Sequence, residues 1–295
     1  MDSVIAITDR LGELDGEHGG QHARPMASTY LAHTVAPYLK ASATEPVRKA
    51  MLSAAAMSCY LTGWMAVDEG LNGLAQRYYV KGLELAGAAD DRLTYCHILR
   101  GISVQAANLG HGATATRYAN AAADAAPVST PRMRAFMAGQ QAHGYAMTDA
   151  KKNALRSLRE TERALDQESS RPGTFGGFNY ATLAYATAQV RYELGDVRGS
   201  VRSLHDHFKL RDTSDSRRSA LTFGGLLAER QLEVGHLDAA CATWSGVLDS
   251  YPAMHSGRVD DHVRTAVKLL SPYRTNSTAR AIHERARAAL AQRSA

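Results

Sequence analysis

The stretches "DEGLNGLAQRYYVKGLELA" at residues 68–86 and "NLGHGATATRYANAAADAA" at residues 108–126 follow one pattern, 40 residues apart. In each, a glycine is followed five residues later by an alanine and then by an arginine–tyrosine pair. The matched positions are Gly70, Ala75, Arg77 and Tyr78 in the first stretch and Gly110, Ala115, Arg117 and Tyr118 in the second. A pattern repeated at a fixed distance indicates a structural unit that the chain uses more than once.

The same unit recurs three more times. Gly195 and Gly235 are again 40 residues apart, and Asp149 takes the glycine position in the middle unit. A glycine in left-handed geometry ends a helix without a side-chain clash. A small residue then lets the next helix approach its neighbour closely. These small residues are Ala75, Ala115, Ala154, Ser200 and Ala240, at spacings of 40, 39, 46 and 40. The sequence therefore predicts five antiparallel helix pairs.

The composition also favours helices. The chain has 295 residues, only 8 of them proline, and 7% aromatic residues. Alanine is abundant and is the best helix former, whereas the β-branched runs typical of a large sheet are scarce. We predict an all-α fold, with the longest break between pairs at residues 166–177.

The repeat resembles the tetratricopeptide repeat (TPR). Gly63, Ala75 and Tyr79 match its small, small and aromatic positions, and Pro127 and Pro252 match its closing proline. The resemblance implies a TPR-like right-handed superhelix over residues 47–252. We expect N-terminal helices at 1–15 and 27–40 to pack on the array within residues 1–46, and capping helices at 253–295.

Three longer stretches resemble the helical sensor region of actinobacterial helix-turn-helix transcriptional regulators. They are "DRLGELDGEHGG", "LTGWMAVDEGLNGLAQRYYVKGLELAGAADD" and "ILRGISVQAANLG". In that family a DNA-binding domain precedes the repeats, but here the match begins near residue 4. The resemblance implies a role in transcriptional or secondary-metabolism control, without direct nucleic-acid binding by this chain.

The remaining composition points to a cytoplasmic protein. The three cysteines are far apart and form no C-x-x-C pair, so neither a disulfide framework nor a zinc site is expected. His205 and His207 are two residues apart and would point to different faces of a helix, which disfavours a shared metal. The N-terminus lacks a basic start, and no apolar run is expected to approach the length of a membrane span. We expect no cofactor, no metal and no membrane partner.

The concave groove of such an array is built from the first helix of each pair. The residues that the helical phase directs into the groove mix aromatic, amide and charged side chains, which is typical of a surface that holds a peptide or small ligand. They are Tyr60, Trp64 and Asp68; His97, Arg100 and Asn108; Phe136, Gln140 and His143; Tyr185, Gln189 and Tyr192; and Glu229. Packing between helices is the alternative role for each of them.

Arg100 is the sharpest candidate among these residues. A guanidinium in a groove can hold a carboxylate, such as a peptide C-terminus, through two parallel hydrogen bonds. The alternative is that Arg100 pairs with Asp68 or another acidic neighbour. The basic run from Lys151 to Arg163 lies on a second helix and is expected on the solvated convex face, as are the paired Arg77 and Tyr78.

We therefore predict a non-enzymatic regulatory or sensor protein that binds a peptide, a small signal molecule or a partner protein in its groove. Two alternatives stay open. One is an enzyme that uses a groove residue such as His143 or Glu229 as acid or base, although the sequence contains no activated nucleophile motif. The other is an assembly scaffold, as a homodimer joined through its terminal helices.

Overall fold

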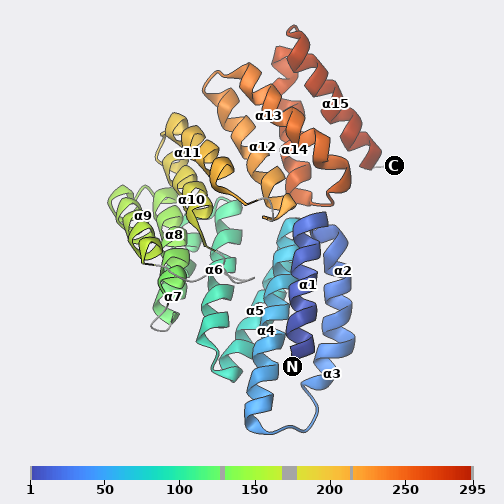
Figure 1. The fold of residues 1–295 in the computed structure, drawn as a ribbon, viewed down its shortest axis with the longest axis vertical. Coiled ribbons are helices and arrows are strands. Elements are labelled where there is room, and N and C mark those ends of the chain that lie inside the picture. The colour runs from blue at the N-terminus through green and yellow to red at the C-terminus, as the bar shows by residue number, and fades with distance from the viewer. Residues whose placement is uncertain (1, 127–129, 168–177, 213–214, 294–295) are drawn as a thin grey trace.

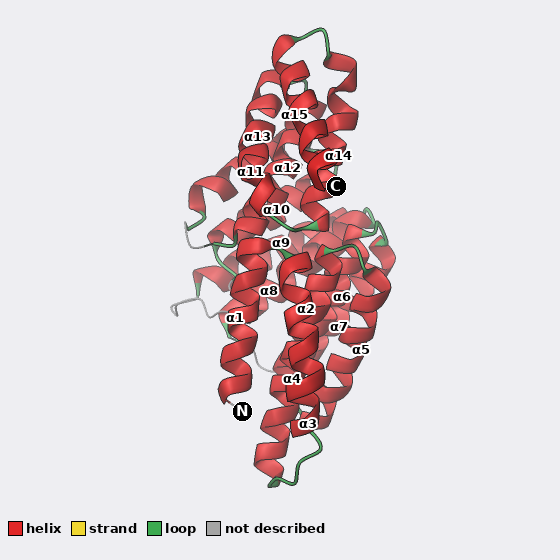
Figure 2. Ribbon diagram, turned by 90° about the vertical axis from the view of Figure 1, so that its right-hand side faces the viewer, coloured by secondary structure: helices red, strands yellow, loops and turns green. Residues whose placement is uncertain are grey.

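The computed structural model describes residues 2–126, 130–167, 178–212 and 215–293, and these residues form helices with no strand among them (Figure 2). Pro127 and residues 168–177 of the expected long break lie outside the described residues. The first helix of each pair is followed by its partner: α4 Glu45–Asp68 with α5 Asn72–Ala89, α6 Arg92–Asn108 with α7 Gly112–Ala125, α8 Pro131–Met147 with α9 Lys151–Asp166, α10 Tyr180–Glu193 with α11 Val197–Leu210, and α12 Arg217–Glu233 with α13 Leu237–Ser250.

The pairing continues past the predicted five units. Helices α14 (Gly257–Leu270) and α15 (Ser277–Arg293) pack on each other, and they also contact α12 and α13 respectively. Figure 1 shows the pairs following one another around a curve from α4 through α8 to α14. The predicted all-α helical repeat is confirmed.

The turns inside the pairs have the geometry that the sequence predicts. All four glycines at the turn are in the left-handed region, with φ of 78°, 76°, 82° and 85° for Gly70, Gly110, Gly195 and Gly235. Asp149 adopts the same region with φ of 55°, although it carries a side chain. Aspartate is one of the few non-glycine residues found there with any frequency.

Close approach of the helices in the first pair depends on missing side chains. The ring of Tyr79 is fully buried against Gly63, where an added Cβ would lie 2.8 Å from Tyr79 Cε1. The same ring and that of Tyr60 lie against Gly101 on α6, where an added Cβ would meet Tyr60 Cε2 at 2.8 Å. Glycine at these positions lets α4, α5 and α6 surround one aromatic core.

The N-terminal segment is more helical than expected. Helix α1 (Asp2–His18) is separated from α2 (Gly20–Tyr30) by Gly19 alone, and a π-helical turn η1 (Leu31–Val35) leads into α3 (Ala36–Tyr38). The expected loop between residues 15 and 27 is therefore wrong. Gly19 makes the sharp break possible, because its φ is 95° and an added Cβ would lie 2.2 Å from the carbonyl oxygen of His255.

Helix α4 corrects the expectation that no segment approaches a membrane span. Among the described helices it alone is long and apolar enough to cross a bilayer by length and composition, with 24 residues and a mean hydropathy of 1.3. In this fold 67% of that apolar stretch is buried, because α1, α2, α5 and α6 pack around it. A core helix of a helical protein passes the same test.

The two ends of the array are joined. Arg218 on α12 donates to Asp15 on α1 at 2.7 Å and lies 3.3 Å from Asp68 on α4. Arg258 on α14 donates to the same Asp68 oxygen at 3.1 Å, and Ser256 does so at 2.8 Å. We call these five residues the end-to-end network. They explain why the C-terminal end of α1 and the N-terminal end of α2 meet the α12–α14 region in Figure 1.

Candidate functional site

The predicted groove residues of α4, α6 and α8 lie on one connected face. The ring centroids of Tyr60 and His97 are 6.2 Å apart, and those of His97 and Phe136 are 5.2 Å apart. Tyr79 on α5 adjoins Tyr60 at 6.2 Å. Together with Arg100 these residues form what we call the Arg100 cluster, on the inner face of the array.

Arg100 is held in this cluster without an acidic partner in the described part of the chain. Its guanidinium carbon lies 3.6 Å from the centroid of the Phe136 ring. Its Nε is buried and has no hydrogen-bond partner among the described residues. Burial lowers the pKa of Arg100, and the phenols of Tyr60, Tyr185 and Tyr79 oppose that shift. A partly buried charge without a counter-ion is costly, and an anion beside it would offset that cost.

Two more buried polar atoms in the cluster lack partners. His97 Nδ1 is 3.2 Å from the carbonyl oxygen of Leu93, and its Nε2 is unpartnered within the described residues. Burial, and then Arg100, lower the pKa of His97 to about 4, so the ring is neutral near pH 7. With Nδ1 donating to Leu93, Nε2 presents an acceptor lone pair. The hydroxyl of the fully buried Tyr79 is likewise unpartnered.

A second basic and aromatic group continues the inner face on α10 and α12. Tyr185 stacks on Phe223 with ring centroids 4.0 Å apart. Burial raises the pKa of Tyr185, while the guanidinium groups of Arg230, Arg258 and Arg100 act in the opposite direction. Arginines from α6, α12 and α14 therefore act electrostatically on one phenol of α10.

Most of the other predicted polar residues hold neighbouring pairs together. Gln140 donates to Ser103 at 2.9 Å. Gln189 accepts from Arg230 at 2.6 Å, and that arginine also lies 4.1 Å from the centroid of the Tyr192 ring. These contacts connect α6 to α8 and α10 to α12, so the side chains contribute to packing between repeats.

The candidate acid and base residues each have a different partner. His143 Nε2 lies 3.9 Å from a carboxylate oxygen of Glu193, and Glu229 contacts His262 Nδ1 at 2.7 Å. Asn108 is exposed at the end of α6, and its side chain forms no hydrogen bond with another described residue. The structure thus does not join His143 and Glu229 to each other.

Asp68 and Trp64 serve the end-to-end network. Asp68 is fully buried and accepts from the Gly20 N–H as well as from Arg218, Arg258 and Ser256. Burial disfavours its charged form, but these donors together lower its pKa. The Trp64 ring lies 5.1 Å below the Arg258 guanidinium. Asp68 is therefore occupied, and the alternative in which it pairs with Arg100 is not what the structure shows.

The sequence did not predict the arginines that α12 and α14 contribute to the inner face. Arg218, Arg230 and Arg258 lie on α12 and α14, more than 100 residues from α4 and α6. Arg230 directly follows the predicted Glu229, but one residue turns an α-helix by about 100°, so the phase that selected Glu229 did not select Arg230. Nothing in the local sequence indicates that Asp15 and Arg218, 203 residues apart, form an ion pair.

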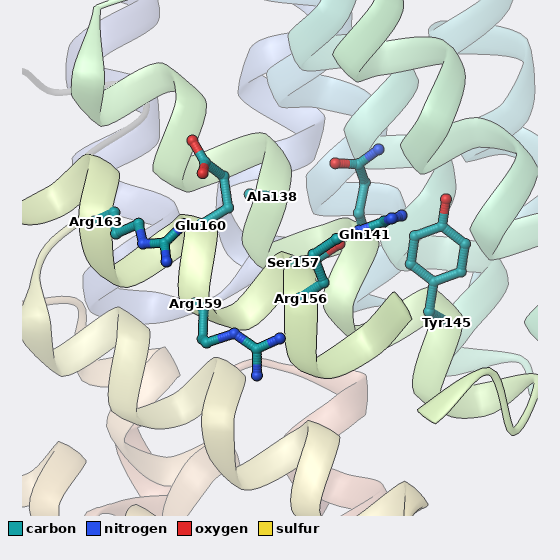
Figure 3. A pocket seen from close by; sticks show the side chains of 8 residues that line it. All are labelled: Ala138, Gln141, Tyr145, Arg156, Ser157, Arg159, Glu160 and Arg163. Atoms are coloured by element: carbon teal, nitrogen blue, oxygen red, sulfur yellow. The ribbon is translucent and has the colours of Figure 1, made fainter. Parts of the chain in front are cut away.

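A basic groove of about 450 Å³ lies between α8 and α9 (Figure 3). Arg156, Arg159 and Arg163 line it together with Tyr145 and Gln141. The three arginines are exposed, which agrees with the expected solvated face. Because water can satisfy all of these groups, the groove lacks the unpartnered buried atoms that distinguish the Arg100 cluster.

The described residues contain no group of three or more histidine, cysteine or acidic side chains that could hold a metal ion. Cys59, Cys96 and Cys241 are buried free thiols. His207 is buried with Nδ1 2.8 Å from the Ala181 carbonyl oxygen, whereas His205 is exposed. The two histidines therefore face different surroundings.

No family model and no curated protein matches the sequence. Among solved structures, the chain is similar to the crystal structure of the P58(IPK) TPR domain, at 15% sequence identity over 88% of this chain and 76% of that chain, with a TM-score of 0.24. At these values the similarity says nothing about a ligand. The fold assignment rests on the helix pairs of the chain itself.

Proposed function

We propose that this chain is a non-enzymatic binding protein whose inner face receives a carboxylate at Arg100. The observation that carries the proposal is a set of three buried polar atoms that have no hydrogen-bond partner among the residues that the structure describes: Arg100 Nε, His97 Nε2 and the Tyr79 hydroxyl. Buried polar atoms in folded proteins almost always have a hydrogen-bond partner. A ligand that supplies the missing partners offsets the free-energy cost of burying these groups.

The three groups select the chemistry of the ligand. Arg100 carries a permanent charge and forms its strongest hydrogen bonds with carboxylates and similar anions. Neutral His97 offers an acceptor at Nε2, which needs a donor on the ligand. The rings of Phe136 and Tyr60 supply apolar walls. The last residue of a peptide has a carboxylate, an N–H and a side chain within a few bonds, so we favour a peptide C-terminus over a simple acid.

On this proposal the ligand acts by changing the curvature of the array. The Arg100 cluster draws residues from α4, α5, α6 and α8, so a bound ligand favours one relative orientation of these helices. The resemblance to the sensor region of actinobacterial regulators supports a cytoplasmic role in transcriptional or secondary-metabolism control. DNA contact would then be made by another chain.

The test compares peptide pools that differ only in the C-terminal group. Fluorescein-labelled random octapeptides with a free C-terminal carboxylate, and the same pool with amidated C-termini, are titrated with the protein and followed by fluorescence anisotropy. We expect binding of the free-acid pool alone. Loss of the charge-assisted contact in Arg100→Gln costs about 1.5–3 kcal/mol, which is roughly a 10- to 150-fold loss of affinity.

The matched control is Arg117→Gln on α7. Arg117 is also an arginine over an aromatic ring, 5.2 Å from Tyr118, but it is exposed. Its substitution should leave peptide binding unchanged. Equal binding of the acid and amide pools, or equal affinity of the Arg100 variant and the wild type, would refute the proposed site.

A further inference from the structure

A second, apolar pocket of about 430 Å³ lies where the N-terminal segment covers the first helix pair. One wall comes from α2, η1 and α3, and the other comes from α4 and α5. Pockets that bind small molecules have volumes of this order and are lined mainly by apolar side chains. The lining residues are Ser28, Leu31, Ala32, Val35, Ala36, Leu39, Ala55, Cys59, Leu74, Arg77, Tyr78, Lys81 and Leu85.

The pocket is hollow because small residues occupy positions where the helices meet. Ala32, Ala36 and Ala55 carry a single methyl group each, and no larger side chain fills the space that they leave. The π-helical turn over Leu31–Val35 runs along the same wall. Single π turns inside α-helices occur often at functional sites, because the extra residue shifts the side chains that follow it.

Positive charge borders this apolar pocket on one side. Arg77 and Lys81 are one turn apart on α5 and both line the pocket. Lys81 pairs with Glu84 at 2.9 Å on the exposed surface, whereas Arg77 makes no ion pair with any described residue. One cation at the rim is therefore free to receive an anion.

Two polar groups of the pocket wall, the Cys59 thiol and the Tyr78 phenol, are influenced by nearby cations. Burial raises the pKa of the Cys59 thiol to about 12, and Lys81 acts against that shift. Burial also raises the pKa of the Tyr78 phenol, while Arg24 and Arg77 lower it. Tyr78 and Arg77 both line the pocket.

We propose that this pocket binds a small amphipathic carboxylate. The hydrocarbon chain would lie against Leu31 and Leu74, and the carboxylate would meet Arg77 at the rim. The apolar walls bury the chain, which contributes about 0.8 kcal/mol for each methylene removed from water. The charge at the rim discriminates an acid from a neutral molecule of the same length. The site shares no residue with the Arg100 cluster, so an experiment that refutes one proposal leaves the other unaffected.

The test uses decanoate as the probe and decan-1-ol as its uncharged counterpart. Both are titrated into the full chain below their aggregation limits by isothermal calorimetry. We expect decanoate to bind with one site per chain and at least fivefold more tightly than the alcohol. The absence of decanoate binding, or equal affinity for acid and alcohol, would overturn the proposal.

Two variants locate the bound probe. Ala32→Leu adds a side chain at an exposed position of the pocket wall and should lower decanoate affinity at least tenfold without unfolding the chain. Arg77→Gln should lower decanoate affinity five- to tenfold and leave the alcohol unaffected. The controls, Ala113→Leu and Arg117→Gln on α7, change an exposed alanine and an exposed arginine away from the pocket. Binding that survives Ala32→Leu, or falls equally in the controls, would place the probe elsewhere.

Discussion

Arg100 lies 3.6 Å above the centre of the Phe136 ring, with no carboxylate beside it in the described part of the chain. Arg218 is buried, donates to Asp15 at 2.7 Å and lies 3.3 Å from Asp68. The half-buried Arg100 and the buried Arg218 are thus in opposite circumstances. The difference distinguishes the arginine that we propose binds a ligand from the arginine that stabilises the fold.

Replacing Arg100 should make the protein more stable. Arg100→Met keeps an unbranched side chain and removes a partly buried charge that has no acidic partner among the described residues. We expect the free energy of unfolding to rise by about 1 kcal/mol, the scale of gain typical when a functional residue is replaced by a better-packed one. Urea denaturation gives the midpoint shift. Arg117→Met on the exposed surface should change it by less than about 0.5 kcal/mol, and a destabilised Arg100 variant would argue for a structural role.

Replacing Arg218 should have the opposite effect. Arg218→Met leaves Asp15 and part of the Asp68 charge buried without their shared partner. Breaking a buried pair in this way costs about 3–5 kcal/mol. The same urea experiment measures the loss. Arg264→Met serves as control, because the Arg264–Asp261 pair is exposed at both ends and should contribute less than about 1 kcal/mol; similar losses in the two variants would contradict this prediction.

Asp15 and His97 should give stability opposite dependences on pH. Burial raises the pKa of Asp15 to about 6, so its contribution to stability is full below about pH 4 and is lost as the pH rises through 6. Burial lowers the pKa of His97 to about 4, so its contribution is full above about pH 6.5 and is lost as the pH falls to 4. The two effects largely offset each other in the wild type.

Single variants expose each of these contributions. Unfolding free energies are measured at pH 4.5 and pH 7. Asp15→Asn removes the component that falls with pH, so its stability should increase more steeply with pH than that of the wild type. His97→Gln removes the component that rises, so its stability should decrease over the same interval. Parallel pH profiles for all three proteins would show that neither group is perturbed by the fold.

Two glycines should respond in opposite ways to the same substitution. Gly63→Ala places a methyl group 2.8 Å from the buried Tyr79 ring, and overpacking of this kind costs about 1–3 kcal/mol. Gly87→Ala lies in α5 with nothing within 4 Å of the added group, and helix propensity should then stabilise the protein by about 0.5–1 kcal/mol. Thermal unfolding of the two variants checks the signs, and a shift in the same direction for both would contradict this account.

The helix pairs were predictable because their signals are local. Gly70 and Gly110 mark left-handed turns, and Ala75 and Ala115 mark close packing, all within one or two turns of each other along the chain. Asp149 forms the same left-handed turn, so the position in the repeat predicts this turn better than the residue type does. The sequence predicts the sixth pair only as capping helices, because no glycine occupies the turn before α15.

The candidate site was predictable in part. Helical phase placed His97, Arg100 and Phe136 on one face, and the structure brings all three together. The same phase placed Asp68 beside them without revealing that Arg218 and Arg258 occupy it. Small rotations between successive pairs accumulate over the array. The contacts between its two ends therefore depend on total curvature, which no local pattern encodes.

An open stack of repeats loses structure from its outermost units, because each end has a neighbour on one side only. In this chain the end-to-end network gives the first helices a second neighbour, since Arg218 and Arg258 hold Asp15 and Asp68 from the other end. The array therefore has no loose terminus at α1 from which melting can begin. Amide hydrogens of α1 should exchange with solvent as slowly as those of α12, and one cooperative transition should replace the gradual fraying of a linear stack.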